Sequence, residues 1–307
     1  MFQNINYILT TCPSYFYMAT IIEGEEEISV RGRSVIKGQK GQNIQNSIRI
    51  AVCSELRRRI IIALREGKRT LSELRDSLGV SSTTAIHALR ELEKENIIFQ
   101  DESRKYGLTR IGYIIGSKLS DFVDAVEVLK KHEDFWLTHD LSGIPPHLLE
   151  KIGWLKGSIL LEDTAIDIFK VHTSFINLLA SSKQIRGVSS IFVPEYPPLF
   201  EKLILKKRAD VELVITEEVF NKMLEVINQE VLKKAIKDEN FKFKLYTVEE
   251  NIKAAFTVTD YFLSLGLFHV DGSYDYNRDI ISYGREAIEW GMELFEWYLK
   301  RAKPIFL

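Results

Sequence analysis

The order of secondary structure between residues 48 and 108 constrains the fold more than any other feature of the chain. Apolar residues recur at helical spacing from Ile48 to Leu64, and Gly67 then ends a first helix. The threonine and glutamate of the following TLSE form a capping box for a second, short helix, LSELRDSL, which a glycine ends. A third helix and a β-hairpin come next. This is the order of a winged helix-turn-helix domain, and we assign residues 47–108 to it.

The third helix carries the residues that most directly indicate function. It lies in SSTTAIHALRELEKENIIFQ, residues 81–100, and the apolar face predicted for it is formed by Ala85, Ile86, Leu89 and Leu92. The hairpin IIFQDESRKYGLT follows, with a charged turn at its tip. A recognition helix enters the major groove with its N-terminal residues at the base edges, while a wing reaches the neighbouring backbone or minor groove. The residues predicted to contact DNA are therefore Ser81, Ser82, Thr83, Thr84, His87, Arg90 and Lys94 on the helix and Ser103, Arg104 and Lys105 on the wing.

Other interpretations of this segment stay open. Ser and Thr cap helices in many proteins, so the third helix considered alone is equally consistent with a solvated face of no function. A winged helix that contacts protein rather than DNA would show the same order of elements. The complete helix-turn-helix and wing together favour DNA binding.

Residues 109–132 predict one long helix. Its apolar residues step by 4, 4, 3, 4 and 3, as in a helix that pairs with another helix; they are Ile111, Ile115, Leu119, Phe122, Val126 and Leu129. This seam is consistent with packing against the same chain or with a dimer interface between DNA reader and sensor. We favour a homodimer, because winged-helix proteins that read palindromic sites use two copies.

Charge and composition set the class of protein. The 307 residues suffice for two domains, and residues 47–132 hold 16 Lys and Arg against 12 Asp and Glu, whereas the remainder holds 25 against 31. No apolar run is long enough to cross a membrane, and the N-terminus lacks a secretory pattern, which predicts a cytoplasmic protein without a membrane partner. Two cysteines exclude a disulfide framework and a four-ligand zinc site. Residues 1–46 form a poorly defined extension, whose basic stretch RGRSVIKGQKGQ fits a solvated linker better than a DNA-contacting arm.

Past Glu133, strand patterns alternate with helical ones. GVSSIFV, DVELVIT and FKFKLYT are β-rich, helical stretches separate them, and AAFTVTDYFLSLGLF predicts two strands joined by a tight turn near Asp260. A last helix is predicted at roughly 280–302. Strand alternating with helix indicates a mixed α/β sheet covered on both faces. The chain is thus predicted as α+β or α/β, with the winged domain, the helix at 109–132 and a mixed-sheet effector domain at 133–307.

Four segments of the C-terminal half resemble one known family. FWLTHDLSGIPPHLLEKIGWL, GVSSIFVPEYP, YFLSLGLFHVDGSYDYNRDIIS and AIEWGMELFEWYLKRA closely resemble the methanogenesis-regulatory-protein middle-domain family, and the resemblance covers residues 48–303. Members of this family are archaeal winged-helix transcription regulators. The resemblance therefore implies an arsenic-repressor-like DNA-binding domain and an effector domain related to the phospholipase-D-like fold.

Catalytic motifs of the candidate enzyme classes do not occur in the sequence. On a phospholipase-D-like fold the reacting histidine has a lysine two positions later, and none of the six histidines here does. No Walker loop, Gly-x-Gly-x-x-Gly or His-Glu-x-x-His pattern occurs either. We therefore predict a non-catalytic effector domain with no cofactor. The alternative is a phospholipase-D-like phosphodiesterase or nuclease tethered to DNA.

A small-molecule effector is predicted to bind beyond the carboxyl ends of the strands. The acidic-aromatic loop GSYDYN is placed beside these ends, with two arginines to meet an anion. The candidate residues are Arg186, Ser189, Ser190, Thr216, Asp260, Asp271, Tyr274, Tyr276 and Arg278. A tight turn in which the acid caps and the tyrosines pack explains the same loop and is the more favoured interpretation.

No metal site is predicted. HDLSGIPPH brings His139, Asp140 and His147 close in sequence, but two prolines interrupt their spacing, which matches no known ligand pattern. Asp140 or Ser142 capping a short helix that begins at the prolines explains these residues more simply. The sequence as a whole predicts a cytoplasmic transcription regulator that binds a double-stranded DNA operator as a homodimer and responds to a small-molecule effector.

Overall fold

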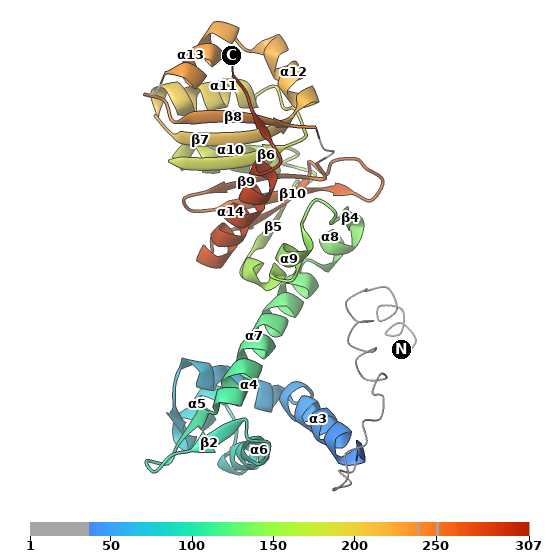
Figure 1. Ribbon diagram of the computed structural model, residues 1–307, viewed down its shortest axis with the longest axis vertical. Helices are drawn as coiled ribbons and strands as arrows, with labels where there is room; N and C mark the ends of the chain where they lie inside the picture. The colour runs from blue at the N-terminus through green and yellow to red at the C-terminus, as the bar shows by residue number, and fades with distance from the viewer. Residues whose placement is uncertain (1–36, 239, 250–251, 307) are drawn as a thin grey trace, which may run out of the picture. The chain divides into compact units, whose positions relative to one another are not determined.

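The computed structural model describes residues 37–238, 240–249 and 252–306, and the side chains from residue 44 onward (Figure 1). Two units are distinguished, Met1–Arg49 and Ile50–Leu307. The extension predicted at residues 1–46 lies mostly outside the described residues, including the arginines of its basic stretch. The part that is described begins helix α3 (Lys37–Val52).

The winged domain forms in the predicted order. Its helices are α4 (Glu55–Ala63), α5 (Leu71–Leu78) and α6 (Ser82–Lys94), with a short 3₁₀ turn at Leu64–Glu66. Strands β1 (Arg69–Thr70), β2 (Ile98–Gln100) and β3 (Lys105–Leu108) form an antiparallel sheet in the order β1-β3-β2.

The predicted helix termini were mostly correct. Thr70 and Glu73 form both hydrogen bonds of the capping box, and Gly79 ends α5 in the left-handed conformation with φ 68°. The single helix predicted from Ile48 to Leu64 is wrong, because the chain breaks between α3 and α4. Ser54 causes the break: it is extended, and its side chain accepts a hydrogen bond from the Arg57 amide at 3.4 Å, which starts a new helix.

Helix α7 (Arg110–Lys131) confirms the long helix predicted at 109–132 and contributes to two hydrophobic cores. Leu119 belongs to the core of the winged domain, while Val128 belongs to the core of the sheet domain. Its first turn packs directly on the backbone that follows α6, since a Cβ added at Gly112 would lie 1.8 Å from the carbonyl oxygen of Ile97. The helix is therefore fixed closely to the winged domain at its start.

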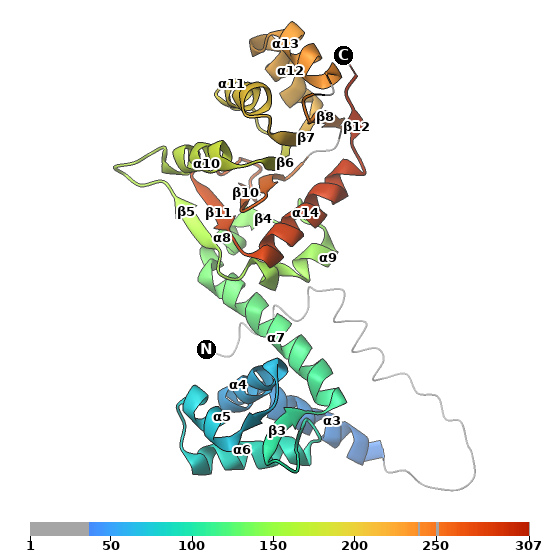
Figure 2. The ribbon, with the colours of Figure 1, turned by 90° about the vertical axis from the view of Figure 1, so that its left-hand side faces the viewer.

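The C-terminal domain is built on a mixed sheet (Figure 2). Its strand order is β12-β8-β7-β6-β9-β10-β11-β5, with β4 paired to β10 at the side, and only the β6–β7 and β7–β8 pairs are parallel. The strands are β4 (His139–Asp140), β5 (Ile159–Glu162), β6 (Gln184–Ser189), β7 (Asp210–Thr216), β8 (Phe243–Val248), β9 (Ala254–Thr259), β10 (Leu263–His269), β11 (Arg278–Ser282) and β12 (Lys303–Pro304). The predicted mixed sheet is confirmed.

Helices cover both faces of this sheet (Figure 2). On one face α14 (Arg285–Leu299) contributes Trp290 and Leu294 to the core that also contains Leu263 and Leu265 of β10. On the other face lie α10 (Lys170–Ser181), α11 (Tyr196–Glu201), which continues as a π-helical turn to Lys206, α12 (Glu217–Val226) and α13 (Gln229–Lys237). The remaining short helices are α8 (Glu133–Thr138), α9 (Pro146–Leu149) and the 3₁₀ turn η2 (Ile152–Leu155). No helix within the described ranges is long and apolar enough to cross a membrane.

Three predicted boundaries in this domain were wrong. The strand predicted at GVSSIFV begins earlier, at Gln184, and leaves the sheet after Ser189. The helical stretch between β7 and β8 breaks because Asn228 caps a separate helix, α13. The helix predicted at 280–302 is a strand up to Ser282 and a helix, α14, only from Arg285 to Leu299, since Ile280 and Ile281 are buried in the sheet.

Candidate functional site

The outward face of α6 carries the predicted recognition residues. All seven of them are exposed, and Ala85, Ala88, Leu89 and Leu92 are buried beneath them. The predicted apolar face needs one correction: Ile86 is half-exposed, and Ala88 takes its place in the core. Nothing in the wing or in α5 covers the exposed face within the described part of the chain.

Two of the four hydroxyl residues are used by the helix itself. Ser81 is the N-cap, and its Oγ accepts the Thr84 amide at 3.1 Å and lies 2.8 Å from the Thr84 hydroxyl. Ser82 and Thr83 remain exposed on the first turn, at the end where a recognition helix meets base edges. The first turn therefore offers two hydroxyls rather than four.

The wing is shaped by one carboxylate, Asp101. Its Oδ1 accepts the amides of Ser103 and Lys105, each at 3.0 Å, and its Oδ2 accepts Lys68 Nζ at 2.9 Å. The Lys68 hydrogen bond and the Lys105 amide lower the pKa of Asp101. Arg104 sits at the tip in the left-handed conformation, with φ 60°, so the turn projects Ser103, Arg104 and Lys105 as a fixed, exposed group.

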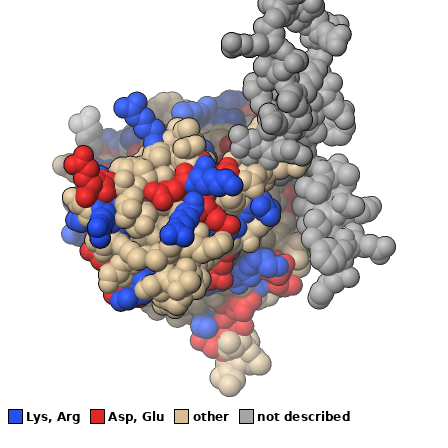
Figure 3. Space-filling model, turned by 90° about the horizontal axis from the view of Figure 1, so that it is seen from below, with Lys and Arg blue, Asp and Glu red and all other residues tan. Residues whose placement is uncertain are grey.

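Basic and acidic side chains alternate on this part of the molecule rather than forming a continuous basic patch (Figure 3). On α6 itself Glu91 forms an ion pair with Arg57, and its Oε2 lies 3.9 Å from His87 Nδ1. Among the described residues, Arg90 and Lys94 have no ion-pair partner, so their charges are available. Electrostatic attraction to phosphate would come from a few cations and not from a large field.

The apolar seam predicted on α7 is divided between packing and exposure. Leu119 is buried in the winged domain and Ile115 packs beside it, so this part follows the packing interpretation. Ile111, Phe122, Val126 and Leu129 are exposed, as is Ile114. An exposed apolar row remains along this helix.

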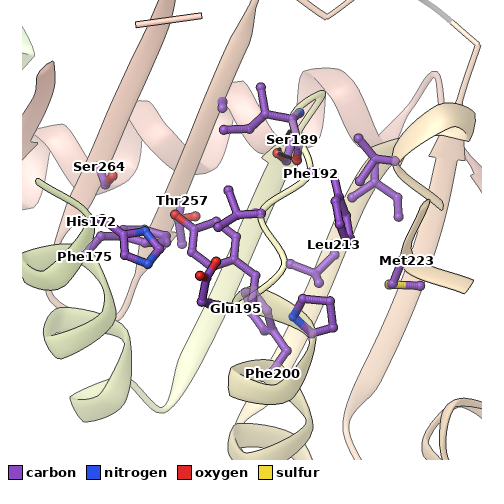
Figure 4. Close-up of a pocket in the computed structure, with 18 of the residues that line it drawn as sticks. His172, Phe175, Ser189, Phe192, Glu195, Phe200, Leu213, Met223, Thr257 and Ser264 are labelled. Carbon is purple, nitrogen blue, oxygen red and sulfur yellow. Dashed lines mark hydrogen bonds between the residues drawn. The ribbon is translucent and has the colours of Figure 1, made fainter. Parts of the chain in front are cut away.

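A large cavity lies between the sheet and the helices α10–α12. Its volume is about 650 Å³, and most of its wall is apolar, with Phe175, Phe192, Phe200, Leu213 and Met223 among the lining residues. Figure 4 shows His172 and Phe175 on one helix and Thr257 and Ser264 on the strands around the same space. A cavity of this size and character is typical of a small-molecule site.

The polar group of this cavity lies on the sheet. Asp279 of β11 is 6% exposed, its Oδ2 accepts the Ser264 hydroxyl of β10, and its Oδ1 has no hydrogen-bond partner. Burial raises the pKa of Asp279 to about 7, although the Ser264 hydroxyl and nearby amides act in the opposite direction. Tyr274 also lines the cavity, and burial raises its pKa well above the ordinary value. Room for this ring exists because Gly266 has no side chain: an added Cβ would lie 2.2 Å from the Tyr274 hydroxyl.

Of the predicted ligand residues, the structure brings Ser189, Tyr274 and Tyr276 to the cavity. The others have local roles. Thr216 caps α12, and Asp260 accepts hydrogen bonds from the amides of Lys183 and Gln184. Asp271 accepts the hydroxyl of Ser273, and the Ser190 hydroxyl donates to the Ile252 carbonyl. Arg186 forms ion pairs with Asp210 and Glu212. The cavity lies over a sheet face, whereas the effector site was predicted beyond the strand ends.

Arg278 belongs to a separate polar cluster. Its Nε donates to Asp275 Oδ2 at 2.7 Å, and the same oxygen lies 3.1 Å from His139 Nε2 and 3.5 Å from His269 Nε2. Burial opposes ionisation of Asp275, but the His139 and Arg278 hydrogen bonds outweigh it and lower the pKa to about 2. Two histidines and one carboxylate lie within metal-ligand range of one another, yet Arg278 already neutralises the carboxylate. This cluster ties β4 to the loop before β11.

The grouping of His139, Asp140 and His147 considered for a metal does not form this cluster. Asp140 accepts the Ser142 amide at 2.9 Å in a turn, and the residue at the N-cap of α9 is Pro145, without a side-chain hydrogen bond. The predicted cap by Asp140 or Ser142 is therefore wrong. His139 Nδ1 donates to the Phe135 carbonyl oxygen at 2.7 Å.

Only a weak sequence signal pointed to the cavity. Its helix α10 was not predicted, so His172 and Phe175 were missed. Asp279 was not singled out, because it comes just before the helix predicted at roughly 280–302 and no strand was expected there. The signal available was a polar residue on an otherwise apolar strand, as in RDIIS and LSLGLF, whose Asp279 and Ser264 form a hydrogen bond between β11 and β10.

The sequence comparisons point to one family. Two family models match, described as the N-terminal and the middle domain of methanogenesis regulatory protein FilR1, at residues 45–127 and 168–301. A methanogenesis regulatory protein FilR1 of Methanothrix harundinacea (strain 6Ac) is 31% identical over 237 residues. The chain belongs to the FilR1 family of methanogenesis regulatory proteins. This FilR1-family chain is matched over 76% of its own length and spans about half of that relative, 52%.

Similar solved structures are more distant from this FilR1-family chain. One is the structure of TrmBL2, described as an archaeal chromatin protein with a novel mode of DNA binding. It is 14% identical with a TM-score of 0.39, and the match covers 86% of this chain and 100% of TrmBL2. A phospholipase D family member, Nuc from Salmonella typhimurium, is 12% identical, with 49% and 99% covered and a TM-score of 0.35. At these TM-scores neither likeness assigns the fold, and the phospholipase-D-like relation stays a prediction.

Proposed function

We propose that this FilR1-family chain is a sequence-specific DNA-binding transcription regulator that reads its operator with α6 and the wing. The observation that carries the proposal is the exposed face of α6, on which Ser82, Thr83, His87, Arg90 and Lys94 lie opposite a fully buried apolar face. Membership of a regulatory family supports the same function. In the proposal, residues 47–108 form the reader, 109–132 the linker and 133–307 the effector domain.

Specific contacts would outweigh general attraction in this mode of binding. Basic and acidic side chains alternate on the surface of the reader, so sequence-independent affinity should be modest. Arg90 is placed for a base edge or phosphate, whereas Lys105 and Arg104 on the wing are placed for the backbone. Replacing Arg90 should cost about 1–3 kcal/mol of DNA-binding free energy and relax sequence specificity. Replacing Lys105 should weaken binding to all DNA sequences alike and reduce the salt dependence of the affinity.

The test is fluorescence anisotropy with labelled DNA from the gene's own upstream region, at two salt concentrations. Arg90→Ala and Lys105→Ala are compared with Arg285→Ala, a matched control, since Arg285 is 91% exposed in the effector domain and pairs only with Glu289. The DNA-binding proposal requires both reader variants to bind more weakly than the control. Equal affinity in all three would mean that the winged domain serves a protein partner instead.

The proposed active form is a homodimer. Ile111, Ile114, Phe122, Val126 and Leu129 leave an apolar row exposed on α7, which is unusual for a monomer surface. Pairing α7 with its copy would bury this row and place two readers for a palindromic site. Phe122, 57% exposed, is the largest side chain of the row.

We further propose that the effector domain is a non-catalytic sensor whose ligand occupies the cavity beside α10. The missing His-x-Lys pattern supports the absence of phosphodiesterase chemistry. Helix α7 contributes Leu119 to one core and Val128 to the other, so a change in the effector core can shift the reader between two states. Phosphodiesterase activity that a single histidine substitution abolishes would overturn this part of the proposal.

A further inference from the structure

The cavity beside α10 is lined by a buried carboxyl group with one oxygen that has no hydrogen-bond partner. Asp279 lines the cavity, is 6% exposed and has an Oδ1 that accepts no hydrogen bond. A buried acceptor without a donor is costly, and such groups in native structures call for an explanation. A hydrogen-bond donor on a bound ligand would explain the unpaired oxygen.

The charges around the cavity select the kind of donor. Among its lining residues there is no Lys or Arg, and the ionisable groups other than tyrosines are Asp163, His172, Glu195, Glu201 and Asp279. Asp163 is engaged by the Val171 amide at 2.8 Å, while Glu195 and Glu201 are exposed. An anionic ligand would meet carboxyl groups of its own sign with no Lys or Arg among the lining residues to compensate it. This set of groups disfavours the anion expected from the sequence.

We propose that the cavity binds an apolar molecule bearing a protonated amine, whose N–H groups donate to Oδ1 of Asp279. The inference rests on the proposed sensor function and specifies its ligand class. The aromatic and aliphatic wall accepts the body of the molecule, and the volume of about 650 Å³ lies in the range of small-molecule sites. Ser264 holds the other oxygen of Asp279, so the carboxyl group is fixed before the ligand arrives.

An ammonium group satisfies this site better than a neutral hydroxyl. Burial raises the pKa of Asp279 to about 7, which means that desolvation opposes its charge. A cation beside it restores the lost stabilisation, and a charge-assisted hydrogen bond is roughly twice as strong as a neutral one. The phenol of Tyr274 lies on the same side of the sheet and stays uncharged, because burial raises its pKa well above the ordinary value.

The test uses three probes with one body and different heads: 4-phenylbutylamine, 4-phenylbutanol and 4-phenylbutyrate. Binding to the full chain without DNA is measured by isothermal titration calorimetry. The variants are Asp279→Asn, Ser264→Ala as a second variant, and Asp76→Asn as a matched control on the surface of the winged domain, where Asp76 contacts Arg75 and Ser72.

The amine should bind on the order of tenfold more tightly than the alcohol, with the carboxylate weakest. Asp279→Asn should remove the advantage of the amine, Ser264→Ala should reduce it, and Asp76→Asn should leave it unchanged. The inference is overturned if the carboxylate or the alcohol binds as tightly as the amine, if Asp279→Asn leaves the amine affinity unchanged, or if the amine does not bind at millimolar concentration. Because DNA is absent, these outcomes are independent of whether the winged domain binds DNA.

Discussion

Asp279→Asn should stabilise the effector domain at neutral pH, and the gain should grow as the pH rises. The pKa of Asp279 increases on folding from its ordinary value of 3.8 to about 7, because the group is buried and one oxygen is unpaired. The folded state therefore binds the proton more tightly than the unfolded state. Stability from this group is fully present below the unfolded pKa and is lost as the pH rises through about 7.

The size of the effect follows from linkage. Each pH unit between the two pKa values changes the free energy of unfolding by about 1.4 kcal/mol, so raising the pH from 5 to 7 should remove about 2–3 kcal/mol from the natural chain. The amide of asparagine does not titrate and keeps the size and one acceptor of the aspartate. The stability of Asp279→Asn relative to the natural chain should thus increase by about the same 2–3 kcal/mol over this interval.

Urea unfolding followed by tryptophan fluorescence measures this directly. The four tryptophans, Trp136, Trp154, Trp290 and Trp297, all lie in the effector domain, so the signal reports that domain and not the winged one. Unfolding midpoints and slopes at pH 5, 6 and 7 are compared between the two chains. A stability difference that does not change with pH would refute the assignment of Asp279 as the buried, titrating group.

Three further predictions test other parts of the structure. Asp275→Asn should destabilise the effector domain at pH 7 by about 2 kcal/mol, because folding lowers the pKa of Asp275 to about 2. The stability difference between the two chains should shrink as the pH falls from about 4 to about 2, which urea unfolding at low pH measures. Gly112→Ala should destabilise the junction of winged domain and α7 by about 1–3 kcal/mol or more, since its Cβ would lie 1.8 Å from a backbone oxygen. Gly284→Ala adds a Cβ with nothing within 4 Å and should lower thermal stability less, by the cost of alanine at the N-cap of α14. Phe122→Glu should leave the fold intact but weaken self-association by about 3 kcal/mol or more, because each copy loses one apolar side chain from the interface. Light scattering after gel filtration should then show a monomer where the natural chain shows a dimer. A natural chain that is monomeric at all concentrations would contradict the dimer proposal.

Local rules explain what could be predicted of the winged domain. The Thr70 and Glu73 capping box, the Gly79 C-cap and the Thr109 start of α7 depend on residues a few positions apart, and each formed as expected. The break at Ser54 was missed because the apolar spacing continues through it. The spacing of apolar residues does not show that a serine side chain can accept a hydrogen bond from a helix amide and so start a new helix.

The cavity depended on long-range pairing that sequence spacing does not reveal. Ser264 and Asp279 meet because β10 and β11 pair antiparallel, and Tyr274 reaches the same region because Gly266 leaves space for its ring. The two arginines expected to attract an anion are instead neutralised, Arg186 by Asp210 and Glu212 and Arg278 by Asp275. Strand existence was predictable, but strand partners and hence the charge of the site were not.

A mobility-shift titration of the full chain on its own upstream region tests whether the chain is a sequence-specific DNA-binding regulator. Unlabelled specific DNA and unrelated DNA serve as competitors, each at two salt concentrations. Sequence-specific binding should give a shift that survives an excess of unrelated DNA, is removed by the specific competitor and is weakened by Arg90→Ala. A shift that unrelated DNA removes as readily as the specific DNA, with or without an amine ligand present, would contradict it.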